Sequence, residues 1–291
     1  MNGIELDTIT RRVLDAAARG DAMDAIALTF LLRRYRAVND DPVDEALGAA
    51  LDRALSSALA DALARHLDER DTAARAGWLT LFSEAATLSE DSRLVDAARE
   101  LIAVLVAEWP SITVVGAGAV SIDACLRATH LVDPRELIPV AIDELERVVG
   151  GAYRPGQGVA HSVGTQDRGG FGDHVRAASA LLSAFEVTGR LPYSMLAEEL
   201  MQTSRTMTAE GADFAMLCEA ARVLCRLAAL HDDAEYRGAA VMATTADYHA
   251  DAEQLLARAA AAAASLGARA AIYGIALGEW RAAGNARRKS P

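Results

Sequence analysis

Aromatic residues are scarce in this chain, since only 5% of its 291 residues are Phe, Trp or Tyr. A hydrophobic core must therefore be built mainly from Ala, Leu and Val, and hydrophobic residues still make up 52% of the chain. That fraction is well above what disordered chains contain. Ala and Leu are strong helix formers, and small Ala faces let helices pack closely. The composition predicts an all-α protein.

Basic residues are also few: 29 Lys and Arg stand against 41 Asp and Glu, which gives a net charge of −12. Nucleic-acid binding needs a basic surface, so we expect no nucleic-acid partner. The one basic cluster, at Arg287–Lys289, falls in a segment, residues 284–291, that we expect to be a frayed, solvated tail.

Cysteine is limited to three residues, which have no zinc or redox spacing; they are Cys125, Cys218 and Cys225. We therefore expect free thiols, a cytoplasmic location, and no metal or cofactor. The first residues lack a basic region followed by an apolar one, so no signal peptide is expected. The most apolar stretch, Leu101–Val120, is interrupted by Glu108 and Pro110, so no membrane span is predicted.

Apolar residues recur with a helical period along nearly the whole chain, and alternating, strand-like runs are missing. No linker rich in Pro, Gly or Ser divides the sequence, so we predict one domain over residues 1–291. Capping residues and prolines mark the helix starts. The predicted helices are 8–19, 22–37, 42–67, 72–87, 92–108, 120–131, 134–150, 174–188, 192–206, 213–230, 234–262 and 268–283.

These helices form pairs, in which an apolar helix rich in small residues alternates with an amphipathic, charged one. The apolar members recur every 40 to 55 residues; their entry points are Asp21, Asp71, Gly118, Asp173, Asp213 and Ala268. Such a repeat predicts stacked helical hairpins. Closure of six hairpins into an (α/α)6 toroid of about twelve helices is the fold we favour. An open solenoid is the alternative, although its repeats are usually more regular and its ends polar.

Two stretches of the second half resemble a known family. Gly172–Met201, which turns at Thr188-Gly-Arg-Leu-Pro, and Glu210–Tyr236 are similar to hairpins of YyaL-type proteins, which are related to spermatogenesis-associated protein 20. The resemblance implies the six-hairpin fold of the N-acylglucosamine 2-epimerase and six-hairpin glycosidase superfamily. It covers about 65 residues. The chain has no Cys-x-x-Cys of the thioredoxin-like domain that such proteins carry, so the resemblance implies a fold and not an activity.

Acidic residues gather where the apolar helices begin, at one end of the predicted ring; they are Asp21, Asp24, Asp71, Asp123, Asp173 and Asp213. Most of them are expected to be helix N-caps. Asp24 and Asp123 lie further inside their predicted helices, so capping explains them less well. These two are therefore the stronger catalytic candidates, and Asp213 is a candidate ligand-binding residue.

The longest stretch without helical pattern is a Gly-rich loop near 150–173. Loops of this length in a compact domain are usually lids or binding loops. It carries His161, Asp167 and Arg168 and leads into Asp173 and His174, which supply a general base, a carboxylate to orient it and an anion-binding group. The alternative is a surface loop with ordinary polar residues.

Two classes of function remain open. The first is an enzyme, or a degenerate relative, acting on a carbohydrate-like small molecule at the ring mouth. Glycoside hydrolysis would need two opposed carboxylates, and epimerisation would need paired proton-transfer groups, for which His161 and His174 are candidates. Trp78, Tyr273 and Trp280 are the few aromatic platforms for a ligand. The second is a non-catalytic scaffold or binding protein, and a terpenoid-cyclase-like apolar cavity is a weaker alternative. The oligomeric state stays open.

Overall fold

The computed structural model describes residues 5–40, 44–207, 212–240, 243 and 245–289. Within these residues it contains thirteen α-helices and one two-stranded sheet, which confirms the all-α prediction. The first seven helices are α1 (Leu6–Ala18), α2 (Ala25–Asp40), α3 (Glu45–Arg65), α4 (Thr72–Ala86), α5 (Ser92–Glu108), α6 (Val115–Arg127) and α7 (Pro134–Leu145). The others are α8 (Phe171–Thr188), α9 (Leu191–Arg205), α10 (Phe214–Asp232), α11 (Ala234–Ala240), α12 (Tyr248–Ala263) and α13 (Ala271–Lys289).

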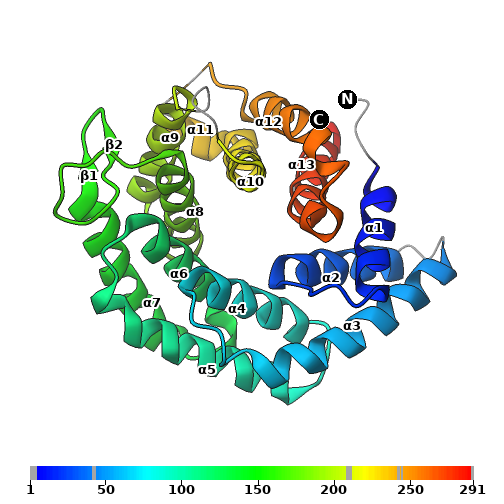
Figure 1. Cartoon of the computed structure of the whole chain (residues 1–291). Coiled ribbons are helices and arrows are strands. Elements are labelled where there is room, and N and C mark those ends of the chain that lie inside the picture. The colour runs from blue at the N-terminus through cyan, green and yellow to red at the C-terminus, as the bar shows by residue number, and fades with distance from the viewer. Residues whose placement is uncertain (1–4, 41–43, 208–211, 241–242, 244, 290–291) are drawn as a thin grey trace.

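Six of these helices surround the centre of the molecule (Figure 1): α2, α4, α6, α8, α10 and α13. Each packs against the next one in this order, and α13 packs against α2. We call them the ring helices. Outside them, α3, α5, α7 and α9 each pack against the ring helix that precedes them in the chain, α12 packs against α10 and α13, and α1 packs against α13 and α2.

Aspartates define the starts of many helices because their carboxylates accept the backbone N–H groups that the first turn leaves unpaired. Asp71 accepts from the Ala74 N–H at 2.8 Å, and Asp213 accepts from the Met216 N–H at 2.8 Å. The α8–α9 turn is set by Gly189, whose φ of 67° lies in the left-handed region that favours glycine.

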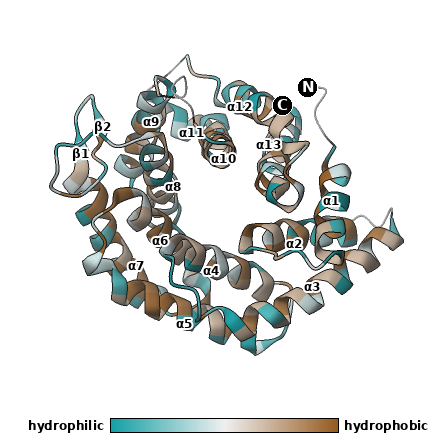
Figure 2. Cartoon of the chain, viewed as in Figure 1, coloured by the Kyte–Doolittle hydropathy of each residue, from teal (hydrophilic) through white to brown (hydrophobic). Residues whose placement is uncertain are grey.

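One hydrophobic core runs through the whole set of helices, and Ala and Leu are its commonest members. Figure 2 shows hydrophobic and hydrophilic residues interspersed along the individual helices, as expected where one face is packed and another is solvated. The core is therefore shared between the ring helices and the outer helices. No described helix is long and apolar enough to cross a membrane.

The Gly-rich loop is partly ordered by a small hairpin that the sequence pattern did not predict. Strands β1 (Tyr153–Arg154) and β2 (Gly158–Val159) pair antiparallel. Beyond them, the Val115 N–H donates to the His161 carbonyl at 2.9 Å, which joins the loop to the start of α6. The loop is thus tied down at the N-terminal ends of α6 and α8.

Several boundaries differ from those predicted. α2 begins at Ala25 rather than at 22, and α6 begins at Val115 rather than at 120. The single helix predicted over 234–262 is two helices, α11 and α12. α13 continues to Lys289, into the segment predicted as a tail, and residues 290–291 lie outside the described residues, as does the predicted helix start at 42.

Candidate functional site

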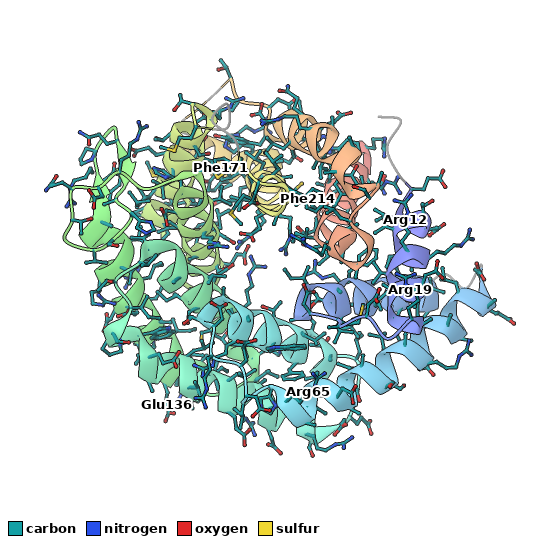
Figure 3. All side chains as sticks on the ribbon, viewed as in Figure 1. Arg12, Arg19, Arg65, Glu136, Phe171 and Phe214 are labelled. Carbon is teal, nitrogen blue, oxygen red and sulfur yellow. The ribbon has the colours of Figure 1, made fainter. Side chains whose placement is uncertain are left out.

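The ring helices enclose a central cavity of about 610 Å³, to which all six of them contribute lining residues. Part of its wall is made of small or apolar residues, among them Ala25, Ala74, Gly77, Val120 and Ile275. The rest is charged. Figure 3 shows side chains of the ring helices extending into the centre, whereas Arg65 and Glu136 lie on the outside of the molecule. The cavity thus combines a small-residue wall with converging ionic groups.

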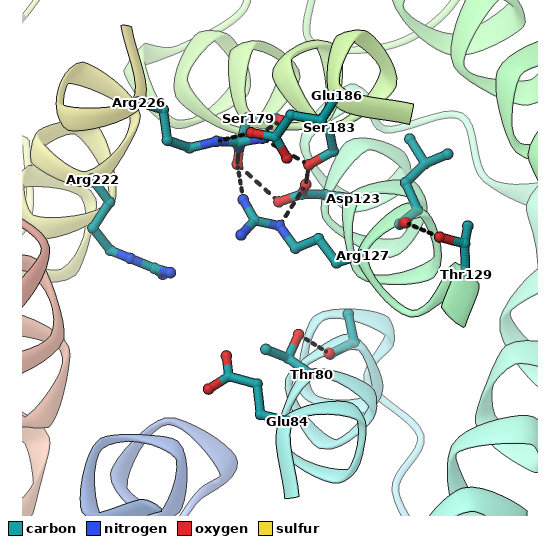
Figure 4. Close-up of polar contacts among 12 residues, drawn as sticks. Thr80, Glu84, Asp123, Arg127, Thr129, Ser179, Ser183, Glu186, Arg222 and Arg226 are labelled. Atoms are coloured by element: carbon teal, nitrogen blue, oxygen red, sulfur yellow. Dashed lines mark hydrogen bonds and ion pairs between the residues drawn. The ribbon is translucent and has the colours of Figure 1, made fainter. Parts of the chain in front are cut away.

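Asp123 of α6 is the centre of the first polar cluster (Figure 4). Its Oδ1 accepts from Arg127 Nε at 3.0 Å and from the Ser183 hydroxyl, and its Oδ2 accepts from the Ser179 hydroxyl at 2.8 Å. Burial by itself would raise the pKa of this carboxyl, but Arg127 and Arg226 hold the pKa well below its usual range. Asp123 is therefore a carboxylate at neutral pH.

Arg226 of α10 completes this cluster from the opposite side. Its guanidinium donates to the Ser179 hydroxyl at 3.2 Å, to the Ser183 hydroxyl at 3.0 Å and to Glu186 at 2.9 Å. Burial and the nearby Arg127 lower the pKa of Arg226, but a guanidinium stays protonated in proteins. Two cationic groups thus converge on one pair of serines.

A second cluster joins α2, α4, α10 and α13. Arg33 donates to both oxygens of Glu84, at 2.6 and 2.8 Å, and to Glu279 at 2.6 Å. Arg222 donates twice to Glu279, at 2.9 and 3.0 Å. Burial alone would raise the pKa of Glu279, but Arg222 and Arg33 lower it to about 2. This carboxylate therefore bridges two arginines at the α2–α13 contact.

A third pair is looser. Arg176 Nε of α8 lies 3.5 Å from Glu219 Oε2 of α10, and this Nε has no hydrogen-bond partner in the described part of the chain. Burial raises the pKa of Glu219, although Arg176 and Arg222 oppose the change. Both side chains line the cavity. The pKa of Glu219 is thus raised, whereas the pKa values of Asp123 and Glu279 are lowered.

The predicted loop cluster is only partly brought together. Asp173 accepts from the Gly170 N–H at 2.9 Å, the Gly116 N–H at 3.2 Å and His161 Nδ1 at 3.0 Å. The hydrogen bond to Asp173 raises the pKa of His161, whose side chain is 55% exposed. A carboxylate that holds one imidazole nitrogen and leaves the other facing solvent is the arrangement of a base and its orienting group.

His174 points elsewhere and holds the loop. Its Nδ1 lies 2.9 Å from the Gly170 carbonyl, and the Val159 N–H donates to its Nε2 at 3.2 Å. These contacts assign the proton to Nδ1 and occupy both nitrogens. Burial lowers the pKa of His174, so the ring is neutral. Gly158 makes this approach possible, because a Cβ there would overlap the imidazole.

The other predicted residues separate into three groups. Asp24 and Trp78 line the cavity together with Asp123, and the Asp24 carboxylate also caps α2 by accepting from the Ala27 N–H at 2.8 Å. Asp24 is therefore an N-cap and not the interior residue that the sequence predicts, because α2 begins at Ala25 and not at residue 22. The exposed residues, away from the cavity lining, are Asp167, Arg168 and Asp213. Tyr273 is fully buried, and its hydroxyl has no hydrogen-bond partner among the described residues.

The cavity arginines were not identified from the sequence; they are Arg33, Arg127, Arg176, Arg222 and Arg226. The sequence does contain a signal for some of them, because Glu219, Arg222 and Arg226 recur at helical spacing within an otherwise apolar helix. Charged residues on one face of a buried helix indicate a polar interior.

A larger hollow, of about 1030 Å³, lies between α1, α2 and α3. Many of its walls are alanines of α3, and Trp78 lines both hollows. Among the described residues, the ion pair of its lining is the exposed one between Asp21 and Arg19, so the central cavity, with its converging arginine–carboxylate pairs, is the stronger candidate site. No group of His, Cys, Asp and Glu that could hold a metal ion occurs within the described ranges.

The geometry therefore gives a central cavity lined by arginine–carboxylate clusters. The oriented His161 and its partner Asp173 lie at the N-terminal ends of α6 and α8, and neither residue is part of that lining. A search against protein-family models finds no match to the chain, and a search of curated proteins finds none either.

Proposed function

We propose that the chain is an (α/α)6 toroid of six hairpins whose central cavity binds a polar, carbohydrate-like small molecule. The observation that carries the proposal is the cavity lining, in which hydrogen-bonded ion pairs reach the same space from all sides. A volume of about 610 Å³ is within the usual range of small-molecule pockets. The three free thiols agree with the cytoplasmic location that forms part of the proposal.

The charge pattern favours a ligand rich in hydroxyl groups. Asp123 and Glu279 are held ionised beside arginines, so the cavity lining contains both hydrogen-bond acceptors and donors. Neighbouring hydroxyls of one molecule can bridge such planar groups, because carboxylates and guanidiniums each offer two parallel hydrogen-bonding positions. Trp78 supplies an apolar surface in the same cavity. An apolar ligand of terpenoid type would make no hydrogen bond to these groups and would shut them off from water.

Ligand-dependent thermal shifts test this proposal directly. We expect a panel of neutral sugars and sugar derivatives to contain compounds that raise the melting temperature. Ala74→Phe fills the cavity without removing a polar group, because Ala74 lines it, so this substitution should abolish the shift. Ala60→Phe on the exposed face of α3 is the matched control and should leave the shift intact. The proposal fails if no compound of the panel binds, or if binding survives in Ala74→Phe.

Catalysis is a second candidate, and the His161–Asp173 pair favours it. The backbone of His161 is fixed on both sides, since its N–H donates to the Asp167 carbonyl and its carbonyl accepts from Val115, both at 2.9 Å. A fixed imidazole held by a carboxylate suits proton transfer. Once a ligand is found, turnover should disappear in His161→Gln while binding persists. Binding without turnover in the unaltered protein would favour the non-catalytic alternative, a helical scaffold or binding protein.

A further inference from the structure

Arg176 differs from the other arginines of the cavity. Each of the other four donates to a carboxylate at 3.0 Å or less; they are Arg33, Arg127, Arg222 and Arg226. Arg176 approaches Glu219 only at 3.5 Å, and its Nε is buried without a hydrogen-bond partner in the described part of the chain. Arg176 is therefore the cavity arginine that the carboxylates of the described residues hold least tightly.

The surroundings of Arg176 do not neutralise its charge as well as those of the other four arginines. Burial favours the uncharged form of Glu219, whereas Asp123 and Glu279 are held ionised. Arg176 and Glu219 thus form the looser pair, and both side chains line the cavity.

The Arg176 side chain lies beside the first turn of α6. A Cβ on Gly116, in the first turn of α6, would lie 3.6 Å from Arg176 Cδ and 3.7 Å from its Nη1. Arg176 therefore lies against α6 on one side and faces Glu219 on the other, while part of its side chain, 32%, stays accessible from the cavity.

We infer that Arg176 recognises an anionic oxygen group, a carboxylate or a phosphate, on the small molecule bound in the cavity. The inference rests on the proposed function, because it assigns one group of the same ligand. A guanidinium binds both kinds of anion through parallel N–H donors. The ligand class is thus a hydroxyl-rich molecule with one acidic group.

Calorimetric titration with three probes tests the inference: glucose, glucuronate and glucose 6-phosphate. The acidic probes should bind more tightly than glucose, and the tighter of the two identifies the anion. Arg176→Gln should weaken the acidic probe by about 10- to 100-fold, the loss expected for one charge-assisted contact. The loss for glucose, which has no anionic group for Arg176 to hold, should be much smaller than the loss for the acidic probe.

Glu219→Gln separates recognition from a structural role. This isosteric change removes the carboxylate that pairs with Arg176 in the described part of the chain, so the acidic probe should bind as well as before or better. A purely structural pair would lose binding alike in both variants, and that result would overturn the inference. Arg19→Gln removes an exposed charge and serves as the control for net charge.

Failure of the inference and failure of the proposed function have different signatures. Equal affinity for glucose and both acidic probes, or an acid preference that survives in Arg176→Gln, overturns the role of Arg176 and leaves the cavity proposal standing. Absence of binding by all three probes and by the wider sugar panel overturns both.

Discussion

Glu279 of α13 links the last ring helix to α2, the first one, and its removal gives the sharpest stability prediction. It accepts three hydrogen bonds, from Arg33 at 2.6 Å and from Arg222 at 2.9 and 3.0 Å. Its side chain is 29% exposed. A pKa of about 2, against 4.5 for an unperturbed glutamate, corresponds to about 3 kcal/mol of stability at neutral pH. Glu279→Gln keeps the shape and removes the charge, so about this amount should be lost.

Calorimetry or circular dichroism measures the effect as a melting temperature. Unfolding entropy scales with chain length and is about 0.6 kcal/mol per kelvin for this protein. A loss of about 3 kcal/mol should therefore lower the melting temperature by about 5 °C. Asp21→Asn is the control, because it breaks an ion pair of 2.9 Å whose two side chains are more than half exposed. Such pairs contribute about 1 kcal/mol or less.

The effect of Glu279 should also depend on pH. Because folding lowers the pKa of this group, its stabilisation is fully present above the unfolded pKa of about 4.5 and is lost as the pH falls toward 2. The difference between the unaltered protein and Glu279→Gln should be constant from pH 7 to 5.5 and then shrink. Equal, small effects of Glu279→Gln and Asp21→Asn, or a difference that persists unchanged to pH 3, would refute the reasoning.

Three further predictions concern other parts of the fold. Gly158→Ala should destabilise the loop by about 2–4 kcal/mol, because the φ of Gly158 is 82° and a Cβ would overlap His174. Proteolysis between residues 151 and 170 should become faster, and unchanged cleavage would count against this prediction. Asp71→Ala removes the α4 cap and should cost about 1 kcal/mol, measured by urea unfolding, whereas Thr72→Ala should cost less. Burial raises the pKa of all three thiols, so Ellman's reagent at pH 8 should label none before unfolding; rapid labelling of native protein would contradict the burial of Cys125, Cys218 and Cys225.

The sequence by itself determined where most helices form and the residues near which they start and end. Apolar periodicity and capping residues are local properties, so the starts at Thr72 and Ser92 and the stop at Gly189 could be predicted within a residue. The same locality explains the errors. Nothing near residue 24 distinguishes a cap from an interior position until the neighbouring helices fix where α2 begins.

Only the tertiary structure decided which polar residues meet. Asp123 pairs with Arg127 on its own helix, a contact that spacing implies, but its serines are 56 and 60 residues away. Arg33 and Glu279 are separated by 246 residues. His161 and His174 lie close in sequence, yet one faces solvent and the other is buried. Periodicity specifies which residues lie on one face of a helix. The packing of six helices around one cavity determines which of these faces line that cavity together.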